Sequence, residues 1–268
     1  MLKHLNQMIG LGTYELLGAA CSRIVEEALE IGYRHIDTAH VYGNHHAIGK
    51  GIKSFPREKL FITSKIALDQ IDDQDVEGSI GKACDLALSE LDTPYLDLYL
   101  IHWPDRKRPL EQMLEAMNGL ISKGKIRHVG VSNYTIHHLQ DGLKMGLKIE
   151  ANQVEFHPYL YQKELLKFCN QNQIRLIAYR PFGKGKLLQE NPLFNEIGKK
   201  YRKSGAQVIL RWLVQKDVPV IPKASSKKHM AENFAIFDFA LTEKEMQSID
   251  ELNKNHRYCD PDWEEFNY

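Results

Sequence analysis

Eight short apolar runs recur along this chain, and segments with helical periodicity separate them. Some runs are apolar at almost every position, as in Leu98-Tyr99-Leu100-Ile101, which is typical of parallel strands buried on both faces. Parallel strands need a long crossover connection, which is usually a helix. The eight runs are Met8–Gly12, Tyr33–Asp37, Leu60–Lys65, Leu96–His102, His128–Ser132, Asn152–Glu155, Arg175–Tyr179 and Val218–Pro222.

The segments between the runs place their apolar residues at the spacing of a helix. From residue 110 to residue 121 the apolar side chains recur at i, i+3, i+4 and i+7, and Gly124 is placed to end that helix. Residues 76–91 have a similar pattern, and residues 24–29 have one that Gly32 closes. The chain therefore alternates strands with helices along its whole length.

This alternation predicts a parallel sheet, and eight strands can close into a (β/α)8 TIM barrel, which leaves no unpaired edge. The length of 268 residues suits one such barrel, and no linker or break in composition divides the chain. We therefore interpret residues 1–268 as a single domain. The alternative is an open, doubly wound sheet. Pro219 argues mildly against the eighth run, because proline cannot donate a hydrogen bond to a sheet.

Composition excludes several classes of partner. The 35 basic and 35 acidic residues balance, which gives no overall charge for binding nucleic acid or an anionic membrane. No apolar run approaches the ~20 residues of a membrane span. The first seven residues are too polar and too few for a signal peptide. The four cysteines lack the spacing of a disulfide or metal framework and indicate free thiols in a reducing compartment. We expect a cytoplasmic protein.

Two histidine pairs, His45-His46 and His137-His138, could be considered metal sites. Adjacent side chains diverge on a helix or a strand, and no third ligand lies near either pair in the sequence. We therefore predict no metal site.

Chemically distinctive side chains lie where these runs end. In a barrel of this kind the C-terminal ends of the strands meet at one rim, so distant residues share one pocket. These side chains are Asp37, Lys65, His102, Asn133, Gln153, Tyr179 and Lys223, with Tyr42 on the loop after Asp37.

Four of these residues, Asp37, Tyr42, Lys65 and His102, form a group suited to carbonyl reduction. A phenol with a pKa near 10 is a poor proton donor at neutral pH, but a nearby ammonium group stabilises its anion. A carboxylate keeps that ammonium charged, and a histidine can hydrogen-bond a carbonyl oxygen. The hydride would have to come from a nicotinamide cofactor. Each residue alone is more often architectural, so the hypothesis depends on all four meeting.

The chain resembles the aldo-keto reductases in seven motifs, which follow in order over nearly the whole length. Together the motifs are highly specific. Gly10 and Gly12 in the first motif are not followed by the third glycine of a Rossmann fingerprint. The motifs are Gly10-Leu11-Gly12-Thr13, GYRHIDTAHVYGN (32–44), ITSKI (62–66), DLYLIHWP (97–104), KIRHVGVSN (125–133), NQVEFHPYL (152–160) and VIPKA (220–224). The resemblance is greatest to the prokaryotic branch of 2,5-diketo-D-gluconate and methylglyoxal reductases.

The resemblance implies a (β/α)8 barrel that binds extended NADPH without a Rossmann fold. It implies that Asp37, Tyr42, Lys65 and His102 are the catalytic residues, with Tyr42 as the general acid. It also implies cofactor contacts along the rim. Those nearest the nicotinamide and pyrophosphate are Thr13, Ser132, Asn133, Gln153, Tyr179 and Phe182. Arg180 departs from the small polar residue of the family and is expected either to hold the pyrophosphate or to face solvent.

The expected adenosine end of the site departs from the family pattern. Its residues are Lys223, Ser225, His229, Glu232 and Asn233. The family often has a serine where this chain has Ala224 and an arginine where it has His229, and the histidine lacks the bidentate fork of arginine. We predict that NADPH is preferred less strongly than in relatives with the arginine. NADH is a possible but less favoured cofactor.

Tyr14, Trp103 and His46 adjoin strand ends and are expected to line the substrate side of the pocket, with rim packing as the alternative. The N-terminus is expected to be too short for the hairpin that plugs the barrel base in many relatives. Residues 253–268 are expected to form a C-terminal tail that packs on the barrel. The tail carries four aromatic residues, Tyr258, Trp263, Phe266 and Tyr268.

We therefore predict a monomeric, NADPH-dependent reductase of small aldehydes and ketones, including ketoaldehydes or keto-sugars. One alternative is a regulatory protein that binds the cofactor and senses the nicotinamide pool with little turnover. A barrel hydrolase or lyase is a further alternative, but it would need paired carboxylates or metal ligands at the rim, and neither is present.

Overall fold

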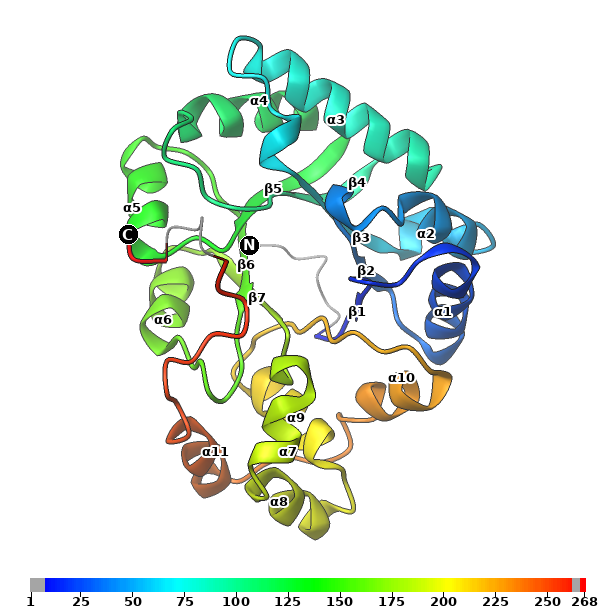
Figure 1. The fold of residues 1–268 in the computed structure, drawn as a ribbon, viewed down its shortest axis with the longest axis vertical. Coiled ribbons are helices and arrows are strands. Elements are labelled where there is room, and N and C mark those ends of the chain that lie inside the picture. The colour runs from blue at the N-terminus through cyan, green and yellow to red at the C-terminus, as the bar shows by residue number, and fades with distance from the viewer. Residues whose placement is uncertain (1–7, 262–265) are drawn as a thin grey trace.

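The computed structural model describes residues 8–261 and 266–268. Within them, seven parallel strands form one sheet in the order of the sequence. Figure 1 looks along the barrel, with the strands around the centre and the helices outside them. The strands are β1 (Leu11–Gly12), β2 (His35–Asp37), β3 (Phe61–Ile66), β4 (Leu96–Ile101), β5 (Ile126–Ser132), β6 (Ala151–Glu155) and β7 (Arg175–Tyr179).

Residues 218–222 close the ring between β7 and β1. The Val220 N–H donates to Met8 and its carbonyl accepts from Gly10, while the Ile221 N–H donates to Ala178. Isolated bridges on both sides replace a regular ladder. The prediction of a regular eighth strand is therefore wrong, because this segment contains two prolines that cannot donate. The barrel is nonetheless confirmed, and an open sheet is excluded.

Helices cover the outside of the ring. Helices at residues 76–91, 110–122 and 163–171 pack against neighbouring strands. The three helical patterns in the sequence correspond to the helices at residues 18–31, 76–91 and 110–122. Within the described part of the chain, no helix has both the length and the hydrophobicity to cross a membrane. The helices are α1 (Gly18–Ile31), α2 (His45–Ile52), α3 (Val76–Leu91), α4 (Leu110–Ser122), α5 (Ile136–Lys144), α6 (Lys163–Gln171), α7 (Lys186–Glu190), α8 (Leu193–Tyr201), α9 (Gly205–Gln215), α10 (Lys227–Phe234) and α11 (Glu243–Asp250).

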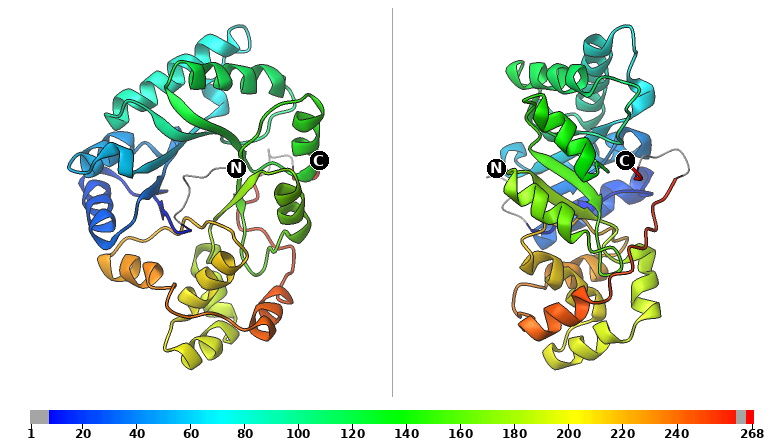
Figure 2. Two further views of the ribbon diagram at one scale, coloured as in Figure 1. Left: turned by 180° about the vertical axis from the view of Figure 1, so that it is seen from behind. Right: turned by 90° about the vertical axis from the view of Figure 1, so that its left-hand side faces the viewer.

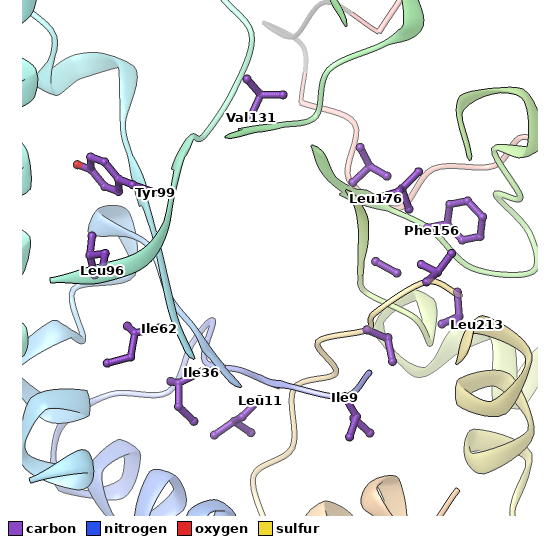
Figure 3. Close-up of a cluster of buried hydrophobic side chains, with 14 of the residues drawn as sticks. Ile9, Leu11, Ile36, Ile62, Leu96, Tyr99, Val131, Phe156, Leu176 and Leu213 are labelled. Atoms are coloured by element: carbon purple, nitrogen blue, oxygen red, sulfur yellow. The ribbon is translucent and has the colours of Figure 1, made fainter. Parts of the chain in front are cut away.

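Alternation along each strand separates an inner core from an outer one. Phe61 on β3 belongs to a small cluster inside the barrel, together with Leu98 on β4 and Ile177 on β7. Ile36 and Ile62 belong to the larger cluster between strands and helices, part of which Figure 3 shows. Side chains two positions apart share a face of a strand, so Lys65 points into the interior like Phe61.

The chain after α11 crosses one end of the barrel, as the edge-on view of Figure 2 shows. The N–H groups of Lys254 and His256 donate to the carbonyl of Tyr159, and Thr135 at the start of α5 donates to the carbonyl of Tyr268. Two expectations concern residues that are not described: the role of Trp263 and the absence of an N-terminal hairpin, which concerns residues 1–7.

Candidate active site

A cavity of about 720 Å³ opens at the end of the barrel where the strands finish. This volume is in the range of small-molecule and cofactor sites, which is about 300–1,000 Å³. Most of the residues predicted from the sequence line this one cavity. They are Thr13, Tyr14, Asp37, Tyr42, His102, Trp103, Ser132, Asn133, Gln153, Tyr179, Arg180, Phe182 and Lys223.

Lys65 and Asp37 form a buried ion pair at the floor of this cavity. The Lys65 Nζ lies 2.6 Å from Asp37 Oδ1 and 2.8 Å from the Thr38 carbonyl oxygen. The other carboxylate oxygen, Asp37 Oδ2, accepts a 2.6 Å hydrogen bond from Gln153 Nε2. Burial raises the pKa of the Asp37 carboxyl, and its bonds to Lys65 and Gln153 oppose this rise. The carboxylate is therefore held on both oxygens.

The Tyr42 phenol stands beside this pair. Its ring centroid lies 5.1 Å from Lys65 Nζ. Desolvation raises the pKa of Tyr42 above its ordinary value, and the Lys65 ammonium opposes that rise. Desolvation lowers the pKa of Lys65, but Asp37 and Tyr42 outweigh it, so the pKa of Lys65 is raised overall. The arrangement keeps a cation beside a protonated phenol, which is suited to donating a proton and stabilising the phenolate that remains.

His102 faces Tyr42 from the end of β4, with 6.0 Å between the ring centroids. Burial, assisted by the charge of Lys65, lowers the pKa of His102 to about 3. The imidazole is therefore neutral at physiological pH. A neutral ring donates from one nitrogen, which is what a substrate carbonyl oxygen between Tyr42 and His102 would need.

A chain of amide and hydroxyl groups lines the cavity next to His102. Tyr179 OH donates a 2.7 Å hydrogen bond to Asn133 Oδ1, and Asn133 Nδ2 donates to the His102 carbonyl at 3.1 Å. Ser132 Oγ donates to the carbonyl of Gln153 at 2.8 Å. Asn133 has a φ of 68°, in the left-handed region that asparagine tolerates better than most residues. Hydrogen bonds thus already orient the Asn133 amide and the Ser132 hydroxyl, and a carboxamide bound here would contact these oriented groups.

Three cationic side chains, Arg180, Lys184 and Lys223, line the cavity together with the acidic Glu15. Lys223 Nζ lies 2.9 Å from Glu15 Oε2, although both side chains are partly exposed. The hydrogen bond and charge of Lys223 lower the pKa of Glu15, and the charges of Lys184 and Arg180 add to this effect. The Glu15 carboxylate thus pairs with one cation and feels the charge of two more. Phosphate groups carry the same sign of charge, so the donor set fits the pyrophosphate of a dinucleotide.

Some predicted residues lie outside the cavity. His46 is exposed on α2, because it points away from the helix face that carries the buried His45, so it does not serve the pocket mouth where we expected it. Around α10, Ser226 rather than the exposed Ser225 caps the helix by accepting from the His229 N–H. The remaining residues are His229, which is exposed, Glu232, which is partly exposed, and Asn233, which is buried.

The tail also supplies residues to the cavity, which the sequence did not indicate. Tyr258 and Cys259 line it, and both of their N–H groups donate to the buried carboxylate of Glu155, at 2.9 and 2.8 Å. Arg180 donates to the carbonyl of Tyr258 at 3.1 Å. Glu155 lies in the motif NQVEFHPYL (152–160) and is a buried carboxylate at a strand end. A buried charge needs polar partners, and this was the only indication in the sequence that Glu155 binds another segment.

Comparisons with known proteins agree with this geometry. Residues 8–254 match the Aldo/keto reductase family. Glyoxal reductase from Bacillus subtilis (strain 168) is 44% identical over 252 residues, which cover 92% of this chain and 89% of the relative.

Solved structures give the same result. A putative 2,5-diketo-D-gluconic acid reductase B superposes with a TM-score of 0.88 at 36% identity, covering 96% of this chain and 94% of the other. An aldo-keto reductase from Bombyx mori in complex with NADP superposes with a TM-score of 0.85 at 31% identity, covering 94% and 91%. The chain therefore belongs to the aldo/keto reductase family.

Proposed function

We propose that this protein reduces small aldehydes and ketones to alcohols with NADPH, and that Tyr42 donates the proton. The observation that carries the proposal is that Tyr42 and His102 line one cavity while Lys65 lies beside Tyr42 beneath it, the three residues coming from three separate strand ends. The NADP complex of the Bombyx mori relative supports the choice of cofactor. NADH is expected to serve less well.

When bound, the nicotinamide supplies a hydride to the carbonyl carbon. The protein's own groups act on the carbonyl oxygen. Neutral His102 donates a hydrogen bond to it, and Tyr42 transfers its phenolic proton to the developing alkoxide. Lys65 stabilises the tyrosinate, and Asp37 keeps the Lys65 ammonium charged and in place.

Small carbonyl compounds, including ketoaldehydes and keto-sugars, are the proposed substrates. Tyr14 and Trp103 line the cavity beside Tyr42 and His102, with ring centroids 5.1 Å from Tyr42 and 6.2 Å from His102. Aromatic faces at this point favour substrates with a small apolar part. The name of the glyoxal reductase relative supports the same substrate class.

We also propose that the protein works as a monomer in the cytoplasm. Three of its four cysteines are buried as free thiols. Burial raises the pKa of Cys21 to about 11 and that of Cys84 and Cys169 to about 12, so these thiols are unreactive. Such thiols suit a reducing compartment. Light scattering after gel filtration would test the monomeric state.

The test of the proposed function is consumption of NADPH with methylglyoxal and with 4-nitrobenzaldehyde. We expect turnover of both, with a larger kcat/KM for NADPH than for NADH at a fixed carbonyl concentration. Binding of NADPH without turnover of either compound would instead support the regulatory alternative. Tighter binding of NADH than of NADPH would contradict the proposed cofactor preference.

A further inference from the structure

A cluster of two imidazoles and a carboxylate lies behind the catalytic turn. His40 begins the short 3-10 turn His40–Tyr42, His45 begins α2, and Glu90 lies near the end of α3. One ligand atom from each of these three side chains lies within 4.8 Å of the others. The cluster lies outside the cavity described above, because none of the three residues lines it.

The cluster is close to the geometry of a zinc site. Zinc bonds to histidine nitrogen and carboxylate oxygen are about 2.0–2.2 Å long, so ligands in a tetrahedron lie about 3.4 Å apart. His45 Nδ1 and Glu90 Oε2 are already 3.0 Å apart. Only His40 has to approach, and it is partly exposed on a short turn. Two histidines and one glutamate leave a fourth position for water.

His45 is held in the orientation that a ligand needs. Its side chain is buried, and its second ring nitrogen, Nε2, lies 2.9 Å from the Oγ of the buried Ser64. In the absence of an ion, Nδ1–H donates to Glu90 and Nε2 accepts from Ser64. With an ion on Nδ1, the proton moves to Nε2 and is donated to Ser64 Oγ. Such a second partner fixes the tautomer of most histidine ligands in proteins.

The backbone around the cluster is tightly packed. A Cβ at Gly49 on α2 would lie 2.7 Å from the carbonyl oxygen of Leu91 and 3.1 Å from that of Glu90. The middle of α2 and the end of α3 are thus in direct contact, one helical turn from His45 and at Glu90 itself. A ligand pair on rigid elements binds an ion with less reorganisation than a pair on loops.

From these contacts we propose that His40, His45 and Glu90 bind one divalent transition-metal ion, with Zn²⁺ as the best match to the ligands. The adjacent pair His45-His46, considered from the sequence, is not the site, since His46 is exposed on another face of α2. The other two ligands are distant in sequence: His40 lies five residues before His45, and Glu90 lies forty-five residues after it.

The experiment is titration of chelator-treated protein with Zn²⁺ by calorimetry, together with Co²⁺ absorption in the visible range. We expect one ion per chain. His40→Gln and Glu90→Gln should each lower the affinity at least tenfold. Ser64→Ala should lower it about tenfold, the lower end of the range for second partners of ligating histidines. Circular dichroism verifies that each variant is folded.

His46→Gln is the matched control, because it removes an exposed histidine from the same helix and should bind Zn²⁺ like the parent. The proposal is overturned if the parent binds no ion at millimolar Zn²⁺, or if His40→Gln and Glu90→Gln bind as tightly as His46→Gln. None of these measurements uses turnover, so the metal site and the proposed reductase activity succeed or fail separately.

Discussion

The side chains of Lys65 and Asp37 are joined by a 2.6 Å hydrogen bond at a point where each is at most 3% exposed. A buried ion pair of this kind is weak support for stability, because removing two charges from water costs about as much as their attraction returns. The ion pair instead acts on the neighbouring phenol of Tyr42. The pair places a permanent cation beside Tyr42, which a neutral pair could not do.

The first prediction concerns the loss of the Lys65 ammonium group. Lys65→Met should lower kcat for carbonyl reduction by about a hundredfold or more, because the tyrosinate formed by proton donation loses its counterion. The change should also move the alkaline limb of the pH profile to higher pH, since Lys65 opposes the rise in the pKa of Tyr42. Steady-state kinetics as a function of pH measures both effects.

The matched variant is Asp37→Asn combined with Lys65→Met. Lys65→Met alone leaves the Asp37 carboxylate buried with its hydrogen bond from Gln153 but without a cation, and breaking a buried ion pair in this way costs about 3–5 kcal/mol of folding free energy. The double variant should recover most of that stability in urea unfolding while its activity stays low. Recovery of activity together with stability would show that Lys65 acts only on folding.

The neutral state of His102 predicts how stability depends on pH. Its pKa is about 3 in the folded protein and about 6.5 in an unfolded chain. Between these values the unfolded state binds the additional proton, so the free energy of unfolding decreases as pH falls. From pH 6.5 to pH 5 this one residue should contribute a loss of about 2 kcal/mol.

Urea unfolding of His102→Gln measures this contribution, and its slope against pH should be shallower than that of the parent. The exposed His46 provides the control, because His46→Gln should leave the slope unchanged. Equal slopes for the parent and His102→Gln would show that the imidazole is charged in the folded protein.

Glu15 is predicted to compete with the cofactor for Lys223. Glu15→Gln removes the carboxylate that now pairs with Lys223 at 2.9 Å, and so leaves this cation available to a phosphate group. Because exposed ion pairs contribute about 0.2–1 kcal/mol, NADPH should bind roughly two- to fivefold more tightly. Fluorescence titration measures the Kd. The control, Glu77→Gln, removes an exposed ion pair with Lys123 outside the cavity. Weaker binding by Glu15→Gln would indicate that Glu15 itself holds the cofactor.

The adenosine end should respond to a restored arginine. His229 is exposed at the start of α10, where Ser226 caps the helix. His229→Arg should strengthen NADPH binding about tenfold through a bidentate contact to the 2′-phosphate, and should leave NADH binding nearly unchanged. His46→Arg adds the same charge on α2 and should alter neither Kd. An equal gain for both cofactors would place the new arginine against the pyrophosphate instead.

The sequence was most informative where the pattern is local. Apolar runs located the strands, and the polar residue at each strand end indicated the rim, since neither inference needs a distant contact. Pro219 is instructive, because its missing N–H was visible in the sequence, and the closing segment does form bridges rather than a ladder.

Contacts between distant residues were not accessible from the sequence. Glu15 and Lys223 are separated by 208 positions, and no local pattern pairs them. The tail enters the cavity because Glu155 binds its backbone amides, which have no sequence signature. His45 and His46 are adjacent, and only the packing of α2 decides that the first is buried and the second exposed.

Replacement of Tyr42 by phenylalanine tests the central claim most directly. Tyr42→Phe removes only the proton donor, so kcat with methylglyoxal should fall by about a hundredfold to ten-thousandfold, while the Kd for NADPH stays within about twofold of the parent. If instead Tyr42→Phe turns over at the parent rate, the phenol is not the acid, and the account of this site is wrong.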